Sequence, residues 1–385
     1  MPDAVVIDAL RTPVGRAAAD SGYYRDVRAE VLAGAVLSGL VERTRIDPAL
    51  VDDVRLGCVQ QQAEQGFDVA RMASLVAGLP IETAAVTVNR NCGSSLTAIN
   101  DAAASIQAGH ERVIIAGGIE HMDHVPMNKG YDPCPAVLRR HGEGVMHMGL
   151  TAEYLAAKYR IPRQQQDAFA LRSHRAAAAA TDSGAFATEI LPTWGRDADG
   201  RKVLLREDQC IRRETSAEAL AALPPAFNPA GGSVTAGNSS PVNVGAAALL
   251  VTSDIVAAEL GLAPIARIRA VAVAGVEPCE MGIGPVPAIH KALARAGVSL
   301  DAVGAIEINE AFAVQVLSCL KLLGIDESRV NTRGGAIAIG HPLGASGARI
   351  ATTLLHRMRS DGVALGLAAM CIGQGQGVAT LFEAL

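Results

Sequence analysis

Two cysteines and a histidine stand among glycines in this sequence, where reactive side chains are held on short, constrained segments. Cys92 lies in NRNCGSS at 89–95, directly before a stretch with apolar residues at helical spacing from 94 to 108. The free N–H groups and dipole of a helix start stabilise a thiolate, so this position predicts a thiol pKa below the usual ~8.5 and a nucleophilic role. The alternative is that a small cysteine merely fits a tight helix start.

His341 and Cys371 occupy comparable places in the C-terminal part of the chain. His341 lies between glycine and proline in GHPLG at 340–344, a constrained turn that makes it a candidate for acid–base chemistry, although a lone histidine is usually structural or solvated. Cys371 follows an apolar strand at 365–370 and precedes IGQGQG at 372–377. The carboxyl ends of strands in open α/β sheets bind ligands, and the glycines let backbone N–H groups approach an oxyanion. This glycine pattern is no dinucleotide fingerprint, because no helix with a downstream acidic residue follows it.

Asn309 is a further candidate, since it directly follows the short apolar strand 305–308. A polar side chain at a strand end can hold a water or a substrate carbonyl, although an ordinary turn is the alternative.

The elements that position these residues follow an α/β pattern in which short apolar runs alternate with alanine-rich helical stretches. One example is the helix 94–108 and the strand after it, which is predicted to end at glycines 117 and 118. A constant shift of 252 residues superposes three such elements without a gap: 54–57 onto 306–309, 92–95 onto 344–347, and 113–116 onto 365–368. One offset across three elements indicates an internal duplication.

The domain boundaries follow from this repeat. We predict an N-terminal half of residues 1–118 with about 243–264, and a C-terminal half of residues 265–385. Residues 119–242 contain loops rich in Met, His, Pro and Gly, charged helices and a turn-rich stretch. Long excursions of this kind usually form binding sites, so we predict an inserted loop domain there.

Composition excludes several classes of protein. With 385 residues, 50% hydrophobic and 19% charged, the chain is too long for one ordinary core and too apolar for disorder. Aromatic residues make up only 3% and the net charge is −5, which argues against nucleic-acid binding. The seven cysteines include no CxxC pair, so no metal site is predicted. No secretory signal or long apolar run is recognised, so we expect reduced thiols, no membrane span and a cytoplasmic location.

Four segments together resemble those of the thiolase family: the Cys92 segment, GGIEHM at 117–122, NEAF at 309–312, and GHP at 340–342 with CIGQG at 371–375. They occur in the family's order, and the similarity runs essentially end to end. The resemblance implies a five-layered fold of two duplicated βαβαβαββ halves with an inserted loop domain. QQQAEQGF at 60–67 and EHMDHVPM at 120–127 look like the thiolase subunit of bacterial fatty-acid oxidation complexes.

The resemblance also implies roles for the candidate catalytic residues. Cys92 would be the acylated nucleophile, His341 would take its proton, and Cys371 would be the second acid–base group. Asn309 would hold a water that forms one oxyanion hole with His341. The N–H groups of Cys92 and Gly373 would form the other.

Coenzyme A contacts are implied in the same way, with CoA as a co-substrate and no permanently bound cofactor. The acyl–pantetheine channel would be lined by His147, Met148, Phe227 and Phe312. Ala236 and Ser240 would contact pantetheine, and Arg212 would lie near the nucleotide. The chain departs from the family at Arg333, where asparagine is usual, and at Pro241 and Val244 in the CoA loop, where glycine and aspartate are usual.

The function implied is CoA-dependent cleavage of 3-ketoacyl-CoA to acyl-CoA and acetyl-CoA by ping-pong kinetics, in fatty-acid β-oxidation. The Cys–His–Cys set separates the chain from ketosynthases and hydroxymethylglutaryl-CoA synthases. The alternatives are a biosynthetic acetoacetyl-CoA thiolase with the same residues, a non-catalytic acyl-CoA-binding homologue, and a hydrolase. The resemblance further implies a homodimer or dimer of dimers, which a hydratase–dehydrogenase subunit of a fatty-acid oxidation complex can join.

Overall fold

The structure is a computed structural model, and it describes residues 2–385. Its strands form a 10-stranded mixed sheet in the order β10-β11-β12-β9-β1-β8-β5-β3-β4, with β2 paired to β8. The strands are β1 (Ala4–Arg11), β2 (Gly15–Arg16), β3 (Asp53–Gly57), β4 (Ala84–Val88), β5 (Val113–His121), β8 (Asn243–Ser253), β9 (Ala266–Gly275), β10 (Ala305–Ile308), β11 (Leu365–Ile372) and β12 (Gln376–Ala384). A separate hairpin joins β6 (Thr193–Arg196) to β7 (Lys202–Leu205).

The sheet divides into two halves at a weak joint. β1 pairs with β9 through only two register positions, Val5 with Arg267 and Val6 with Ala266. The strands on the β1 side come from the N-terminal half, and those on the β9 side come from the C-terminal half. Each half therefore contributes its own part of the sheet, and the two parts are joined along one short edge.

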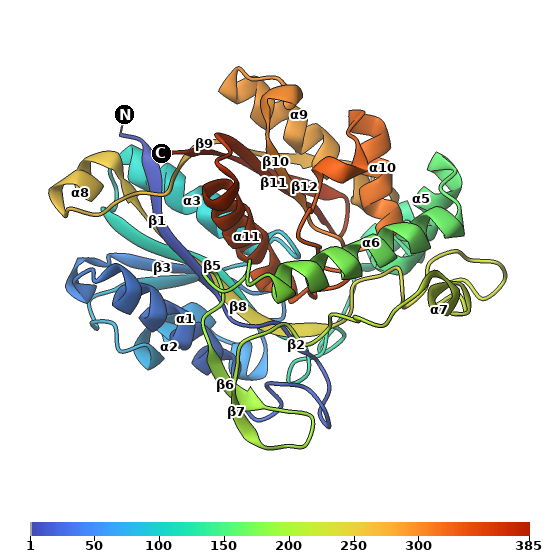
Figure 1. Ribbon diagram of the computed structural model, residues 1–385, viewed down its shortest axis with the longest axis horizontal. Helices are drawn as coiled ribbons and strands as arrows, with labels where there is room; N and C mark the ends of the chain where they lie inside the picture. The colour runs from blue at the N-terminus through green and yellow to red at the C-terminus, as the bar shows by residue number, and fades with distance from the viewer. Residues whose placement is uncertain (1) are drawn as a thin grey trace.

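Helices cover both halves in layers (Figure 1). The outer helices are α1 (Ala29–Thr44) and α2 (Val69–Val76) on one side, and α9 (Pro285–Ala296) and α10 (Ala313–Leu323) on the other. The central helices are α3 (Ser94–Ala108) and α11 (Ser346–Asp361). The short helix α8 (Asp254–Glu259) follows β8.

Alternation along the strands confirms this layering. In β1, Val5 and Ile7 belong to the core beneath α1 and α2, whereas Ala4 and Val6 belong to the core around α3 and α11. In β11, Ala369 faces the core beneath α9 and α10, and its neighbours in the chain face α3 and α11. Since successive side chains of a strand point to opposite faces, each sheet is buried on both sides. The five-layered α/β fold predicted from the resemblance is confirmed.

The predicted repeat appears in the positions where elements begin. The first residues of three pairs of elements differ by 252: β3 and β10 (Asp53, Ala305), α3 and α11 (Ser94, Ser346), β5 and β11 (Val113, Leu365). The two halves therefore use one fold twice, as the offset predicted.

The repeat is also visible in the contact between α3 and α11. The backbone N–H of Ala348 donates to Ser95 Oγ at 2.9 Å. A Cβ on Gly347 would lie 2.4 Å from the backbone nitrogen of Leu96, so only glycine allows this approach. Ser95 and Leu96 correspond to Gly347 and Ala348 under the offset of 252, so the helices touch at equivalent residues near their N-terminal ends. This crossing brings the segments before both helices to one place.

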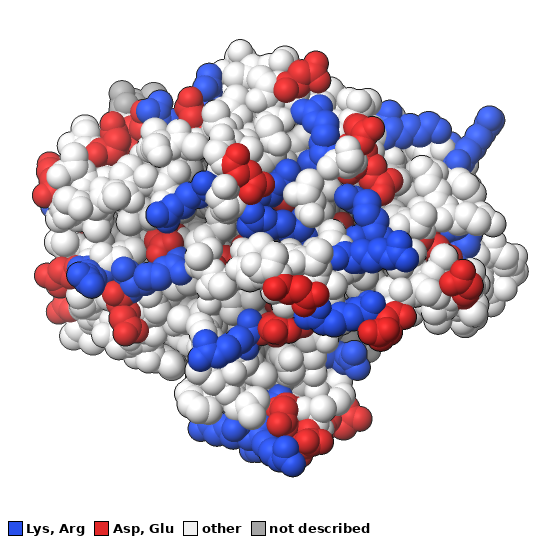
Figure 2. All heavy atoms as spheres, viewed as in Figure 1, with Lys and Arg blue, Asp and Glu red and all other residues white. Residues whose placement is uncertain are grey.

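Between β5 and β8 the chain leaves the sheet and forms α4 (Pro135–His141), α5 (Met148–Tyr159), α6 (Arg163–Asp182), the β6–β7 hairpin and α7 (Ala217–Ala221). In Figure 1, α5, α6 and α7 lie together beside α10, and the hairpin projects separately. On the face shown in Figure 2, cationic and anionic side chains are interspersed. Among the described residues, no helix has both the length and the apolar character needed to cross a membrane.

Candidate active site

The fold brings four of the predicted residues to one region between the halves. Cys92 lies two residues before α3, and His341 lies five residues before α11, so the crossing of these helices gathers both segments. Asn309 and Cys371 stand at the carboxyl ends of the neighbouring parallel strands β10 and β11. The N–H of Asn309 donates to Ala369 O at 3.0 Å, which fixes the end of β10 beside that of β11.

Hydrogen bonds fix the ring of His341 in one tautomer. Nδ1 lies 2.6 Å from Ser346 Oγ, and that hydroxyl lies 2.8 Å from Pro342 O. A serine hydroxyl has one hydrogen, and a carbonyl oxygen can only accept, so Ser346 donates to Pro342 and accepts from Nδ1–H. The lone pair is therefore on Nε2, which lies 3.4 Å from Asn309 Nδ2. The backbone N–H of His341 donates to Asn243 Oδ1 at 2.8 Å and holds the turn in place.

The environment of His341 keeps the imidazole neutral. Burial, together with the nearby cation of Arg349, lowers its pKa to about 3. Only 4% of His341 is exposed. A neutral ring with a free Nε2 lone pair can accept a proton, which a general base requires.

Cys92 differs from the expectation of a lowered thiol pKa. Burial raises the pKa of its thiol more than the N–H groups of Gly373 and of Cys92 itself lower it, so that the pKa is about 11. The nearby carboxylate of Glu120 adds a smaller increase. The prediction of a thiolate stabilised by the helix start is wrong for this structure, because burial outweighs the N–H groups. Cys92 therefore carries a neutral thiol and needs a base to take its proton.

Cys371 is the second thiol of the site. It is the last residue but one of β11 and is buried, and burial raises its pKa well above the usual range, with a further increase from nearby Cys92. The turn after β11 contains Gly373, whose carbonyl accepts from Asn91 Nδ2 at 3.3 Å. Two neutral thiols and a neutral imidazole therefore share one region, in which Cys371 and His341 are buried and Cys92 is partly exposed.

The side chain of Asn309 has an unused acceptor. Its Oδ1 is buried and has no hydrogen-bond partner among residues 2–385, while Nδ2 faces His341. Asn331, in the left-handed region with φ 50°, supports this turn from behind. Its Oδ1 accepts from Ile308 N–H at 2.9 Å and its Nδ2 donates to Glu310 Oε1 at 2.9 Å. The end of β10 is thereby held so that Asn309 presents an amide to the site.

Several of the predicted CoA residues lie in a continuous row that starts at Gly373. A Cβ on Gly373 would lie 3.1 Å from Met148 Sδ, and one on Gly149 would overlap the ring of Phe227. The rings of Phe227 and Phe312 meet edge to face, with centroids 6.0 Å apart. His147 caps α5 next to Met148 and is exposed. Ser240 extends the row, since its N–H donates to Ala311 O at 3.0 Å.

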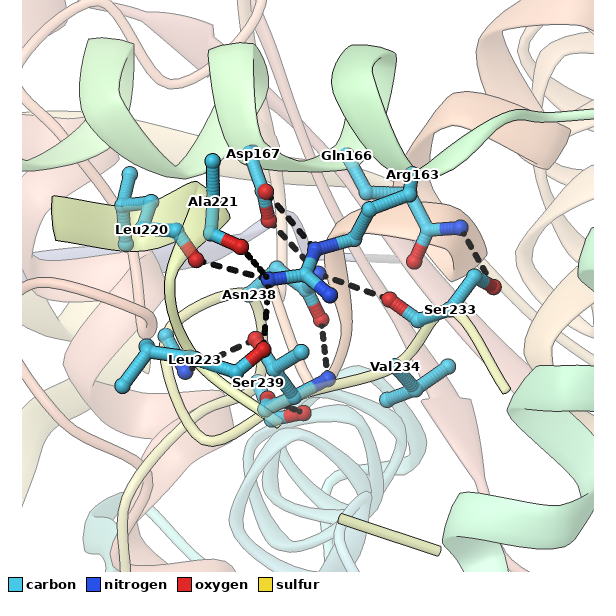
Figure 3. A network of polar contacts seen from close by, with 12 residues as sticks. Arg163, Gln166, Asp167, Leu220, Ala221, Leu223, Ser233, Val234, Asn238 and Ser239 are labelled. Atoms are coloured by element: carbon cyan, nitrogen blue, oxygen red, sulfur yellow. Dashed lines mark hydrogen bonds and ion pairs between the residues drawn. The ribbon is translucent and has the colours of Figure 1, made fainter. Parts of the chain in front are cut away.

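The segment that carries Phe227, Ala236 and Ser240 is tied to α6 by a network of polar contacts (Figure 3). Arg163 pairs with Asp167 at 2.7 Å and donates to Leu220 O at 2.6 Å. Asn238 donates to the other oxygen of Asp167 at 2.9 Å. These bonds fix a long loop that has little secondary structure of its own, and they leave Ala236 exposed.

Arg212 lies in a different part of the surface. Its backbone N–H donates to His174 Nδ1 at 3.2 Å, and the residue lines a cavity of about 430 Å³ together with Arg213, Thr215 and Leu223. Because Leu223 also accepts from Arg163, this cavity adjoins the tied loop. Glu214 also lines this cavity, and Arg213 pairs with Asp182 and Glu207, so Arg212 is the cation there that can attract an anionic group.

Glu64, His121 and His124 come close enough for their ligand atoms to hold a metal ion. Every ring nitrogen, however, already has a partner. His121 accepts from His124 N–H and contacts Tyr24 O, and the ring nitrogens of His124 contact Glu64 at 3.0 Å and Arg25 O at 2.9 Å. The cluster is thus arranged as a hydrogen-bonded set that ties loops together.

The departures from the family pattern lie outside the thiol–imidazole region. Arg333 pairs with Asp361 at 3.0 Å, at the end of α11. Val244 is a core residue of β8, 1% exposed, and packs beneath α1 and α2. Pro241 lies just before β8. Val244 therefore faces the core.

Comparison with known proteins gives the family. The model of the thiolase N-terminal domain matches residues 4–254, and that of the thiolase C-terminal domain matches residues 262–384. The chain belongs to the thiolase family. This family consists of acyltransferases, so the protein is an enzyme of that class.

Similar thiolases span the whole chain. Proteins named 3-ketoacyl-CoA thiolase from Pseudoalteromonas translucida and from Escherichia coli O1:K1 are each 52% identical, covering 100% of this chain and 99% and 100% of theirs. The crystal structure of the Bacillus anthracis acetyl-CoA acetyltransferase superposes with a TM-score of 0.91 at 40% identity, covering 100% of this chain and 99% of that one.

Proposed function

We propose that this thiolase cleaves 3-ketoacyl-CoA with CoA to give acyl-CoA and acetyl-CoA, through an acyl group carried on Cys92. The observation that carries the proposal is the meeting of the Cys92 thiol, the neutral His341, the Cys371 thiol and the Asn309 amide in one region. The names of the 52% identical relatives support the same reaction.

In the first half-reaction, His341 Nε2 takes the proton of the Cys92 thiol, and the sulfur forms a bond to C3 of the substrate. The N–H groups of Cys92 and Gly373 already lie at that sulfur, where they can bind the oxyanion that develops on the C3 oxygen. The C2–C3 bond then breaks, and its electron pair leaves as the enolate of acetyl-CoA. Cys371 protonates the enolate carbon and becomes the thiolate.

The enolate oxygen needs donors of its own. We assign this task to His341, which now carries the proton on Nε2, and to a water bound by Asn309, whose Oδ1 is otherwise unpartnered. In the second half-reaction the Cys371 thiolate takes the proton of the CoA thiol. The CoA sulfur attacks the thioester, acyl-CoA leaves, and His341 returns the proton to Cys92. Every proton is accounted for by these three groups, and CoA is a co-substrate.

A thiolase specific for acetoacetyl-CoA is the main alternative. Our choice is supported by the names of the 52% identical relatives. A cavity of about 560 Å³ has Gln374, the neighbour of Gly373, in its wall, and its mixed lining includes Met146, Val137, Lys129 and Asp132. The kcat/KM of thiolysis should be measured along a series from acetoacetyl-CoA to long-chain 3-ketoacyl-CoA. Activity on acetoacetyl-CoA alone would support the biosynthetic alternative.

A binding protein without catalysis, and a hydrolase, are the remaining alternatives. The set of Cys92, His341 and Cys371 is retained and meets in one region, which favours catalysis over binding. In the hydrolase, water would replace CoA as the second nucleophile. Measuring acyl-CoA and free fatty acid in the same assay separates the two outcomes.

The excursion 119–242 is the part of the chain that we propose as an acyl-CoA-binding domain, between the halves 1–118 with 243–264 and 265–385. The row from Met148 to Phe227 and the cavity at Arg212 support this assignment. Removal of the Arg212 cation (Arg212→Gln) should raise the KM for CoA and leave kcat largely unchanged.

We also propose a cytoplasmic homodimer or dimer of dimers, which a hydratase–dehydrogenase subunit can join. β4 is an edge strand paired only with β3, and Val86 on it is 45% exposed. Nearby in the chain, Ile81 is 75% exposed and Phe67 is fully exposed. An apolar sheet edge of this kind pairs readily with a second copy. Val86→Lys should yield monomers in sedimentation experiments, and an unchanged dimer would contradict this interface.

A further inference from the structure

Glu120 is a buried carboxylate that the proposed reaction does not use. It lies near the end of β5 and is completely buried. Burial raises the pKa of this carboxyl, while hydrogen bonds from Val59, Gln60 and Gly344 lower it. A buried charge of this kind requires partners that come from the fold itself.

Four neutral N–H donors surround the carboxylate. Oε2 accepts from Val59 N–H at 2.9 Å and from Gly344 N–H at 2.8 Å. Oε1 accepts from Gln60 N–H at 3.1 Å and from Gln65 Nε2 at 3.0 Å. Each oxygen accepts two N–H bonds, and Oε1 is also within reach of the Cys58 thiol. The ionised form therefore satisfies the site, whereas the hydrogen of a protonated carboxyl would point at one of these donors.

The donors come from two halves of the molecule. Val59, Gln60 and Gln65 belong to the loop after β3, whereas Gly344 lies three residues after His341. The backbone around Gly344 is seated directly on the N-terminal half: a Cβ there would lie 2.6 Å from Ile119 O. The turn that carries His341 is therefore docked into the other half, and Glu120 holds its N–H group.

We propose that Glu120 is a positioning residue for catalysis, which fixes the His341 turn against the N-terminal half and places Nε2 within reach of the Cys92 thiol. The proposal rests on the proposed thiolase reaction. His341 is linked to Gly344 by a proline and one further residue, so a shift of the Gly344 N–H moves the imidazole as well. A displacement of about 1 Å at a catalytic group can reduce a rate by about 100-fold.

Glu120 also acts on the nucleophile through its charge. The pKa of Cys92 is raised mainly by burial, lowered by the N–H groups of Gly373 and of Cys92 itself, and raised by the Glu120 anion. The other titratable groups near this carboxylate and thiol are Cys58, whose Sγ lies 3.9 Å from Oε1, and Cys371. Removing the Glu120 anion should therefore make the Cys92 thiol easier to ionise. The same change should displace the imidazole of His341, the base that takes the thiol proton.

These opposite effects define the experiment. In Glu120→Gln, an amide replaces one oxygen, and whichever way it turns, two N–H donors face an NH2 group. We expect kcat for thiolysis to fall by about 10- to 100-fold with the KM for CoA nearly unchanged. The midpoint pH for alkylation of Cys92 by iodoacetamide should move to lower pH. Glu189→Gln is the matched control, because Glu189 is equally buried but contacts Arg11 and Thr353.

Two outcomes would overturn the proposal. One is a folded Glu120→Gln enzyme with wild-type kcat. The other is a combination of three results: kcat falls, the alkylation midpoint does not shift, and Tm falls as much as in Glu189→Gln. That combination would mean that Glu120 has a purely structural role. If Glu120→Gln does not fold, Glu120→Asp takes its place, with reduced kcat and an unchanged alkylation midpoint expected. Absence of thiolysis in the wild type counts against the proposed function, and the alkylation measurement still tests Glu120.

Discussion

Ser346 Oγ lies 2.6 Å from Nδ1 of His341, and its own hydrogen is committed to Pro342 O at 2.8 Å. The hydroxyl can therefore only accept from the imidazole, and the lone pair of His341 must be on Nε2. Ser346 is the first residue of α11, so the start of this helix sets the tautomer of the base. This role of Ser346 follows from the contact with His341 and was not predicted from the sequence.

Ser346→Ala should lower activity through this contact. Without the acceptor, the ring loses its fixed tautomer and orientation, and we expect kcat to fall by about 10- to 100-fold with little change in the KM for CoA. Steady-state kinetics measures the effect. Ser318→Ala is the control, since Ser318 is also fully buried but donates only to Val314 O. Equal effects of the two substitutions would contradict the role of Ser346.

Asn309→Ala should weaken stabilisation of the enolate. The amide is the group proposed to hold a water in the oxyanion hole, and losing such a donor costs about 3 kcal/mol, or about 100-fold in kcat. Asn100→Ala serves as a control at a buried asparagine that contacts Thr380 instead. If Asn309→Ala kept wild-type kcat, the proposed hole would be wrong.

Cys371→Ala should separate the two chemical tasks. Cys92 and His341 remain, so the enzyme should still accept an acetyl group from acetyl-CoA. Proton transfer at the α-carbon requires Cys371, so exchange of the α-protons of acetyl-CoA with deuterated water should be lost. NMR of acetyl-CoA follows the exchange. Normal exchange in this variant would remove Cys371 from the role given to it.

The pH dependence of stability should reflect His174. Burial, together with the nearby cation of Arg212, lowers its pKa to about 4. Between the unfolded pKa of about 6.5 and this value, the unfolded chain binds a proton that the folded protein does not. The free energy of unfolding should therefore fall as pH falls through this window, by up to ~1.4 kcal/mol per pH unit from this group. In His174→Asn, urea titrations should show a shallower fall, and an unchanged slope would contradict it.

The repeat made much of the fold predictable. The offset of 252 found in short motifs also separates the first residues of three pairs of elements, because both halves have the same fold. One of these pairs is α3 and α11, the two helices that cross. The strand that was expected to end at Gly117 and Gly118 instead continues to His121. A Cβ on Gly118 would lie 2.1 Å from Gly344 O, so this glycine allows the other half to approach and does not end the strand. That contact is not visible in a local pattern.

The residues of the candidate site could be predicted from the sequence, but the direction of the pKa shift of Cys92 could not. Cys92, His341, Cys371 and Asn309 stand out by their positions at element ends. The direction of the Cys92 pKa shift depends on burial in the folded protein, which outweighs the N–H groups of Gly373 and Cys92, and to a smaller extent on Glu120, which lies on β5. The residues next to Cys92 in the sequence indicate a helix start, but they do not show that the folded protein buries the thiol. The functions of Ser346 and Glu120 likewise arise only from contacts between the halves.

Peptide mass spectrometry of the enzyme, mixed with a 3-ketoacyl-CoA in the absence of CoA and quenched in acid, tests the central claim most directly. The account predicts that the acyl group shortened by two carbons is found on the peptide that contains Cys92, that adding CoA removes it as acyl-CoA, and that Cys92→Ser abolishes it. An unmodified Cys92 peptide during turnover, or normal thiolysis by Cys92→Ser, would contradict the account.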